Sequence, residues 1–356
     1  IEANNSRQFF RYVIRKLGRS HDTGVLKDSD GQVIADDAGK ACLLNTYFNS
    51  INVVDDAACP AFQLRTDGRL DDVSFDANAV RKHCNKMRPK FSSGPDGYPP
   101  FLLKQIGPSI AGIIAQLFQS FMSIGRVPSD WKQAIIKPLF KKGASSDPAS
   151  YRPISLTSIF SKLMEKIIVE QMLKYLLTNN LISKQQHGFL SRRSTATNLI
   201  GSLNDWTVKM ENRQCQSVAY IDFAKAFDSV SHPKLLTKLG AYGIGGVLLN
   251  WISDFLTGRS HVTRVGHCLS PIAFITSGVI QGSCLGPLLF LLYINDLAEA
   301  ISAVATMKLY ADDVKLYSNM SAVPTNANVL QDQLNRLLEW SAVWQLPISL
   351  MKCCIL

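Results

Sequence analysis

Apolar and polar residues alternate along two short runs, 307–310 and 314–317, on either side of a break. A period of two is typical of β-strands, so the sequence predicts a β-hairpin with Asp312 and Asp313 in its turn. In a turn, two successive carboxylates can reach one point. Two like charges that close are costly unless a multivalent cation lies between them. A solvated Asp-Asp turn is the alternative, and the dipeptide alone favours it.

The rest of the chain mixes helical and strand periodicity. Helices are predicted over 5–19 (basic and amphipathic), from a cap at Asp36 or Asp37 to Ile51, and over 76–87, 99–106, 108–124, 151–177, 194–213, 233–241, 246–257, 287–300 and 328–344. Strands are predicted in a hairpin over 25–34, over 134–140 and 217–223, in a hairpin over 260–277, and over 347–356. Residues 52–72 are acidic and irregular, which indicates a linker. Because strands and helices do not alternate regularly, an α+β fold is expected.

The composition of the chain indicates which classes of protein it can belong to. The 356 residues are 46% hydrophobic and 9% aromatic, enough for a core, and the net charge of +10 favours a polyanionic partner. The eight cysteines have no Cys-x-x-Cys spacing, so we expect reduced thiols and neither a disulfide framework nor a zinc site. No signal peptide or bilayer-spanning apolar run is recognised, so an intracellular protein of the nucleus or cytoplasm is expected. The first residue is Ile and the last lie inside a predicted strand, which indicates a fragment.

A third carboxylate, Asp222, ends the predicted strand 217–223, about 90 residues before the Asp312–Asp313 pair. If the two strands are antiparallel neighbours, all three carboxylates can converge. Such a cluster could hold two Mg²⁺ ions about 3.5–4 Å apart, because hard oxygen ligands suit this metal. Two such ions support phosphoryl transfer. Spacing alone does not show convergence, so three unrelated surface aspartates remain the alternative.

The surrounding residues resemble the ordered motifs of reverse transcriptases. The three palm motifs are matched by 220–230, 277–287 and 310–313, and the fingers motifs by 131–143, 151–156 and 186–189. The sequences of these motifs are similar to those of non-LTR (LINE-like, jockey/CR1-type) retrotransposon polymerases. Residues 93–97 and the N-terminal hairpin look like the connector of such elements. The resemblance covers nearly the whole chain.

This resemblance implies a right-hand polymerase fold with helical fingers and an antiparallel-sheet palm. It implies an N-terminal connector over 1–72, fingers over 73–215, and a palm over 216–356 that stops before the thumb. The implied enzyme is an RNA-directed DNA polymerase, a nucleotidyltransferase that adds dNTPs to a primer 3′-hydroxyl. Its implied partners are an RNA template and a DNA primer, and its implied cofactor is a pair of Mg²⁺ ions, with Mn²⁺ as a substitute.

The resemblance also assigns roles to residues. Asp222, Asp312 and Asp313 are implied as catalytic metal ligands, with Asp222 bridging both ions. The implied dNTP-binding residues are Lys137, Lys141, Arg152, Phe223, Phe227, Gln281 and Gly282. Phe223 would contribute its backbone to the triphosphate, and the Phe227 ring would exclude a 2′-hydroxyl. Arg152 offers a bidentate fork to phosphate.

The remaining assignments have plainer alternatives. Lys352 is a candidate general acid toward pyrophosphate, although its surroundings depart from the usual motif. Arg192 and Arg193 are candidate nucleic-acid contacts, with a solvated basic face as the alternative. Phe227 could be a core residue and Gln281–Gly282 a plain turn. Asp228 is expected to make a structural hydrogen bond or to cap the following turn, with a catalytic role as the alternative.

Two functional alternatives stay open. The first is a catalytically inactive RNA-binding relic of a polymerase, which the three intact aspartates argue against. The second is a maturase- or telomerase-like reverse transcriptase, which the motifs at 93–97 and 151–156 argue against.

Overall fold

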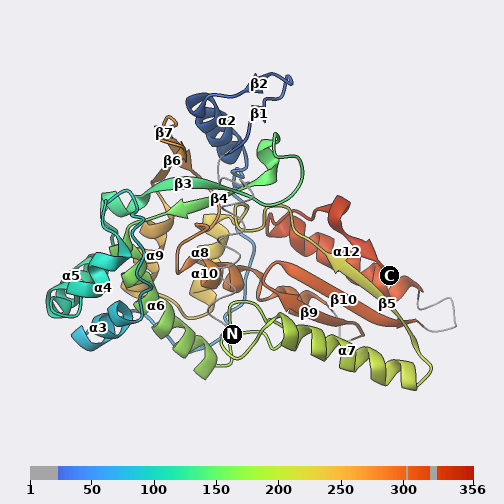
Figure 1. Ribbon diagram of the computed structural model, residues 1–356. Coiled ribbons are helices and arrows are strands. Elements are labelled where there is room, and N and C mark those ends of the chain that lie inside the picture. The colour runs from blue at the N-terminus through green and yellow to red at the C-terminus, as the bar shows by residue number, and fades with distance from the viewer. Residues whose placement is uncertain (1–22, 302–303, 321–326) are drawn as a thin grey trace, which may run out of the picture. The chain divides into compact units, whose positions relative to one another are not determined.

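The computed structural model describes residues 23–301, 304–320 and 327–356 (Figure 1). The predicted basic helix at 5–19 lies outside these residues. The chain divides into two compact units, the first made of Ile1–Ser50, Ile135–Ser155 and His261–Ala273, and the second of Ile51–Ala134, Leu156–Ser260 and Phe274–Leu356. The division into connector, fingers and palm follows other boundaries and stays a prediction. The mixture of helices and sheets confirms the α+β class.

The first unit combines a helix with short strands. Its elements are β1 (Leu26–Lys27), β2 (Val33–Ile34), α2 (Asp37–Ser50), β3 (Gln133–Phe140), the 3-10 turn η2 (Pro148–Ser150), β4 (Tyr151–Leu156), β6 (Arg259–Val265), β7 (Cys268–Leu269) and β8 (Ala273–Ile275), some of which cross the unit boundary. β1 and β2 form the predicted hairpin. The larger sheet has the order β4-β3-β6-β7, with β8 also paired to β6. Asp36 caps α2, because its Oδ1 accepts from the Gly39 N–H at 2.7 Å.

One predicted helix is partly wrong. Residues Tyr151–Leu156 form strand β4, and the helix α6 begins only at Ile159. Pro153 lacks the N–H that a helix interior requires and disfavours the helical conformation of Arg152 before it. Ser158 then starts the helix, since its hydroxyl accepts from the Ser161 N–H.

The second unit carries most helices and the other large sheet. Its elements are α3 (Ala77–Asn85), α4 (Pro100–Ile106), α5 (Ala111–Ile124), η1 (Ser129–Lys132), α6 (Ile159–Thr178), α7 (Thr195–Glu211), β5 (Cys215–Ile221), α8 (His232–Ala241), α9 (Gly246–Leu256), α10 (Gly286–Ile294), α11 (Leu297–Ala300), β9 (Thr306–Tyr310), β10 (Asp313–Met320), α12 (Ala327–Val343), η4 (Leu350–Lys352) and β11 (Cys354–Ile355). The predicted linker, 52–72, contains no helix and only an isolated bridge at Leu70.

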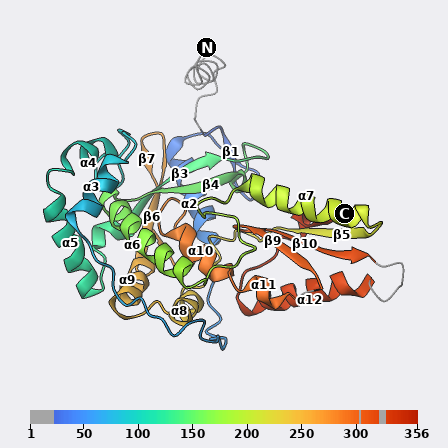
Figure 2. The same cartoon turned by 90° about the horizontal axis from the view of Figure 1, so that it is seen from below.

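The sheet of the second unit has the order β11-β5-β10-β9, and every neighbouring pair is antiparallel. Figure 2 shows α7 along one face of this sheet and α11 with α12 along the other. Inward-facing residues of the strands are therefore buried, including Ala219, Leu309 and Leu316, which are at most 1% exposed. Helices on both faces hold the ends of β5 and β9–β10 at fixed places.

The predicted helix 287–300 is interrupted. α10 ends at Ile294 and α11 starts at Leu297. The buried Asn295 side chain donates to Leu181 O and to the Tyr242 hydroxyl, and it accepts from the Ser183 N–H. These contacts with distant segments outweigh the local preference for one continuous helix.

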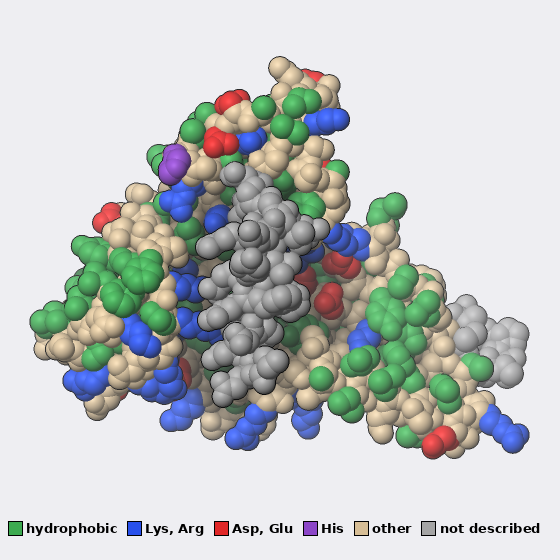
Figure 3. All heavy atoms as spheres, viewed as in Figure 1, with side chains coloured by type: hydrophobic (Ala, Val, Ile, Leu, Met, Phe, Trp, Pro, Cys, Tyr) green, Lys and Arg blue, Asp and Glu red, His purple; other side chains and the backbone are tan. Residues whose placement is uncertain are grey.

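Helix α7 leaves apolar side chains on the surface. Leu199, Ile200 and Leu203 are 49%, 65% and 47% exposed, and Figure 3 shows hydrophobic side chains gathered where α7 runs. Among the described helices, none alone is long and apolar enough to cross a bilayer. The pair α4 and α5, bent by 117°, passes that test of length and composition together.

Candidate active site

The turn between β9 and β10 carries two of the three predicted carboxylates. Tyr310 pairs with Asp313, so Ala311 and Asp312 are the two turn residues and Asp313 is the first residue of β10. Ala311 has a φ of +56°. A positive φ at the first turn residue is typical of a type II′ hairpin, where glycine is favoured. Because this residue is alanine, the turn stores roughly 1–3 kcal/mol of backbone strain.

The third carboxylate is aligned with this turn by strand register. β10 pairs with β5 in the register Val314↔Ile221, so one further step puts Asp313 opposite Asp222. The predicted antiparallel pairing of the two strands is therefore confirmed. Residues opposite each other in an antiparallel pair have Cα atoms about 4.5–5.5 Å apart. Asp222 and Asp312 are partly exposed and Asp313 is exposed, so these carboxylates are not sealed in the core.

Lys352 lies against one of these carboxylates, Asp222. Its Nζ is 3.1 Å from Asp222 Oδ2, and both side chains are partly exposed. The segment before it is held by the Ser349 N–H, which donates to Asp222 O at 2.8 Å. Within residues 23–301, 304–320 and 327–356, no three His, Cys, Asp or Glu side chains form a recognisable metal cluster. The two-metal site therefore stays a prediction, supported by the register and by the oxygen chemistry of the three side chains.

The segment after Asp222 packs against the loop around Gln281. Gln281 Nε2 donates to both carboxylate oxygens of Asp228 at 2.7 and 2.8 Å. The Val279 N–H donates to Phe227 O, and the Gly278 N–H to Val230 O. A Cβ at Gly278 would lie 2.8 Å from Asp228 Cα, so only glycine fits this approach. Asp228 thus makes the predicted structural hydrogen bond, and it holds the amide of a predicted nucleotide-binding residue.

Phe227 is fixed between two other rings. It stacks on Phe290 of α10 with a centroid distance of 4.5 Å and an interplanar angle of 15°. The exposed Phe189 meets it edge-on at 6.0 Å. Phe227 remains partly exposed, so a selective role for its ring stays open. Phe223, by contrast, is 1% exposed and contacts Trp340, which leaves only its backbone for a triphosphate.

The other predicted ligand contacts are divided between the units. Lys137, Lys141 and Arg152 are exposed residues of the β3–β4 region in the first unit. Their assignment as dNTP-binding residues stays a prediction, as does that of Gly282, which has a φ of +119°. Arg192 in the second unit is exposed and is a predicted nucleic-acid contact.

Arg193, the other predicted nucleic-acid contact, also makes hydrogen bonds within the protein. Its Nη1 donates to the carbonyls of Ser183, at 3.2 Å, and Lys184, at 3.1 Å, and also to Gln186 O. These contacts fix the segment before α7, and the phosphate contact of Arg193 stays a prediction.

The sequence patterns missed a buried carboxylate, Glu165 of α6. It is 0% exposed, and its Oε2 accepts from the N–H groups of Cys284 and Leu285 at 2.6 and 3.1 Å. It thereby anchors the start of α10 directly after the Gln281 loop. Burial raises the pKa of Glu165, against the lowering effect of these hydrogen bonds. The sequence feature that could have indicated this buried carboxylate is an acidic residue inside the apolar stripe of α6.

Gln186 belongs to the predicted fingers motif 186–189, but its contact with the turn was not predicted: it is 1% exposed and contacts the Ala311 backbone. A buried amide in a loop gives no periodic signal.

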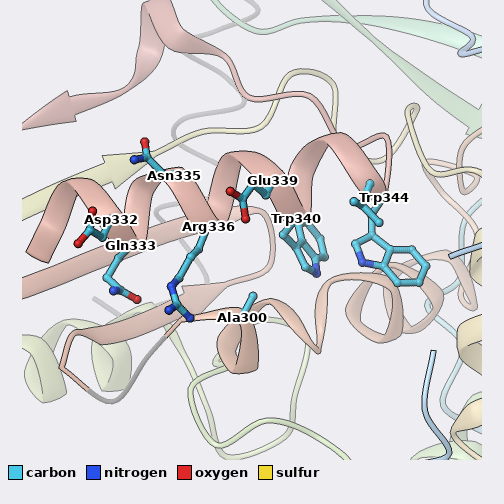
Figure 4. A pocket seen from close by; sticks show the side chains of 9 residues that line it. Ala300, Asp332, Gln333, Asn335, Arg336, Glu339, Trp340 and Trp344 are labelled. Atoms are coloured by element: carbon cyan, nitrogen blue, oxygen red, sulfur yellow. The ribbon is translucent and has the colours of Figure 1, made fainter. Parts of the chain in front are cut away.

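A separate pocket of about 730 Å³ lies along α12 (Figure 4). Its lining includes Arg336, Glu339, Trp340 and Trp344, with Ala300 opposite them. None of the three aspartates lines this pocket, so its chemistry is distinct from that of the hairpin turn.

Comparison with known proteins agrees with the motifs. Residues 139–356, more than half of the chain, match the family model described as reverse transcriptase (RNA-dependent DNA polymerase). The chain is 28% identical over 284 residues to the RNA-directed DNA polymerase from mobile element jockey of Drosophila funebris, covering 77% of this chain and 31% of that protein. The corresponding jockey protein of Drosophila melanogaster is 31% identical over 247 residues, with coverages of 67% and 27%.

A third relative is the probable RNA-directed DNA polymerase from transposon BS of Drosophila melanogaster, 29% identical over 273 residues, with coverages of 74% and 30%. The chain thus spans under a third of the length of these relatives. Together they confirm the resemblance to non-LTR retrotransposon polymerases.

Proposed function

This chain belongs to the reverse transcriptase family, and on that premise we propose that it extends a primer 3′-hydroxyl with dNTPs opposite an RNA template. The observation that carries the proposal is the β5–β10 register, which aligns Asp222 with Asp313 beside the Asp312 turn. We further propose that the three carboxylates hold two divalent cations, Mg²⁺ in the first place. The net charge of +10 suits a nucleic-acid partner.

The donor set fits such cations. Three carboxylates supply only hard oxygen ligands, and they come from a turn and two strand ends that helices hold from both faces. Cations bound there supply positive charge for the attacking and leaving oxygens of a phosphoryl transfer. The same group contains an ammonium, since Lys352 contacts Asp222. That contact supports Lys352 as the acid that gives a proton to the departing pyrophosphate.

The remaining residues shape the nucleotide site in this proposal. The ring of Phe227, held by Phe290, opposes a ribose 2′-hydroxyl. The loop at Gln281, tied to Asp228 and anchored beyond by Glu165, supports the base. The task of these side chains is orientation, which contributes to rate because reacting atoms are held in line.

Primer extension tests the function directly. The chain is incubated with poly(rA), oligo(dT), dTTP and Mg²⁺, in parallel with Asp312→Asn and with Asp332→Asn, an exposed position on α12. We expect incorporation by the chain and by Asp332→Asn, and its loss in Asp312→Asn. Equal incorporation by Asp312→Asn refutes the proposed site. RNA binding without incorporation by the unaltered chain favours the inactive relic.

A further inference from the structure

The segment from Gln185 to Gly188 runs beside β9 and adds to the edge of its sheet. Gln186 forms an isolated parallel bridge with Leu309. The Leu309 N–H donates to Gln185 O at 2.9 Å, and the His187 N–H donates to Leu309 O at 2.8 Å. Two backbone hydrogen bonds therefore fix this segment immediately before the turn at Ala311.

The Gln186 side chain reaches the turn itself. Its Oε1 accepts from the Ala311 N–H at 2.9 Å and from the Gly188 N–H at 2.7 Å. Its Nε2 faces Ala311 O at 3.5 Å. Gln186 is 1% exposed, so water does not compete for these groups. The residue whose N–H is held is the one with the strained φ of +56°, and such strain persists only where the surroundings over-determine it.

Gly188 allows this close approach. A Cβ at this position would lie 2.4 Å from Ala311 N and 3.0 Å from Ala311 Cα. Those atoms are backbone and cannot swing aside as the end of a flexible side chain would. Any side chain at residue 188 must therefore displace either the segment or the turn.

The segment is itself held in place by Arg193, just before α7, and by residues of α7. The Arg193 guanidinium donates to three carbonyls of 183–186. His187 Nδ1 lies 3.0 Å from Thr197 Oγ1, and the buried Asn198 donates to Leu309 O at 3.1 Å. Thr197 also completes the capping box with Ser194 at the start of α7. The segment that contacts Ala311 is thus itself fixed in position by hydrogen bonds.

We propose that Gln186 and Gly188 are positioning residues, which hold the turn in the conformation that presents Asp312 and Asp313. An alanine released from a positive φ would relax toward another turn type and re-aim both carboxylates. The importance of that change for catalysis rests on the function proposed above. The contacts on Ala311 do not.

Kinetics of Gln186→Leu test the catalytic part. This variant has a side chain of similar volume but lacks the Oε1 acceptor. We expect kcat for dTTP incorporation to fall roughly 10- to 100-fold, because misplacement by about 1 Å has that effect. The Mg²⁺ concentration for half-maximal activity should rise, while KM for dTTP stays within about twofold. Gln186→Glu, which keeps a carbonyl acceptor, should recover part of the loss. Gln185→Leu is the matched control, since that exposed side chain contacts Ser183 Oγ and not the turn.

A rescue experiment separates positioning from general stability. Glycine adopts a positive φ without strain, so Ala311→Gly should restore a substantial part of the activity lost in Gln186→Leu. A residue that only stabilises the fold would not be rescued in this way. Activity in the double variant no better than in Gln186→Leu, or unaltered kinetics in Gln186→Leu, overturns the proposal.

Hydrogen exchange gives a readout that needs no activity. Peptides over 307–313 should exchange faster in Gln186→Leu, while those over β5 keep their protection. Unaltered exchange at 307–313 also overturns the proposal. If the unaltered chain incorporates no dTTP, the proposed function fails, yet exchange still decides whether Gln186 holds the turn.

Discussion

Replacing Lys238 with methionine should destabilise the second unit strongly. The Lys238 side chain is 0% exposed, and its Nζ donates to Asp296 Oδ1 and to Tyr293 O. Rings surround the ammonium, the nearest being Trp344 with its centroid at 3.6 Å. Methionine keeps a long apolar stem, so the variant removes the charge with little change in volume.

The expected loss of unfolding free energy follows from the Asp296 carboxylate, which stays buried after Lys238 is replaced. In the variant, Asp296, whose side chain is 7% exposed, keeps the Trp340 Nε1 donor at 2.9 Å but loses the Lys238 ammonium. Removing one partner of a buried ion pair costs about 3–5 kcal/mol of unfolding free energy. Burial lowers the pKa of Lys238 to about 8, against the opposing effect of Asp296, so its ammonium is still present at pH 7.

Urea denaturation at pH 7 measures the effect, with Trp340 and Trp344 as nearby fluorophores. The matched control is Lys234→Met, one turn earlier on α8. The Lys234 side chain is also 0% exposed, but its partner Asp56 is 43% exposed, so water can take over that contact. We expect a clearly smaller loss for Lys234→Met. Equal losses in the two variants would refute the reasoning, because burial of the remaining carboxylate would then not decide the cost.

Three further predictions concern other residues. Phe227→Val should admit ribonucleotides, lowering the dTTP/rUTP ratio of kcat/KM by roughly tenfold or more; an unchanged ratio contradicts the selective role. Burial lowers the pKa of His261, whose ring nitrogens have no hydrogen-bond partner in the described residues, so only the unfolded chain gains the proton as pH falls below about 6.5. His261→Phe should therefore reduce the loss of thermal stability between pH 7.5 and 5.5, and an unchanged loss counts against this account. Glu165→Leu leaves two buried N–H donors unpaired and should cost roughly 2–6 kcal/mol of unfolding free energy in denaturation, with Glu165→Gln closer to wild type; equal stabilities would contradict the anchoring role.

The sequence was most informative where chemistry and local pattern coincide. The alternation before and after the Asp312–Asp313 pair predicted its hairpin, and the apolar strand before Asp222 predicted the partner strand. The caps at Asp36, Ser158 and Ser194 place helix starts, because a side-chain acceptor before an apolar stripe is a local feature. Of these three caps, only the one at Asp36 was predicted. The cap at Ser194 was taken as the first helical residue, and the cap at Ser158 was hidden because the apolar residues of β4 run on into α6.

Long-range contacts explain what was not predicted. Asn295 interrupts a helix because its amide bonds Leu181 and Tyr242, both distant in sequence. Gln186 acts on Ala311 from 125 positions away. Glu165 reaches Cys284 across 119 positions. No window of sequence shows such partners, because burial of a single polar group depends on the whole fold.

The register between β5 and β10 limits which changes in length this chain can accept. Deleting one residue from β5 while its partner strand stays in place would turn each later side chain of that strand to the opposite face. Val218 and Ile221, which are now buried, would then face the opposite side of the sheet. Asp222 would no longer be opposite Asp313. A one-residue deletion within β5 should thus disrupt both the packing of this strand and the proposed catalytic site. Residues 143–145 of the first unit are exposed and belong to no strand, so a deletion there has no strand register to shift.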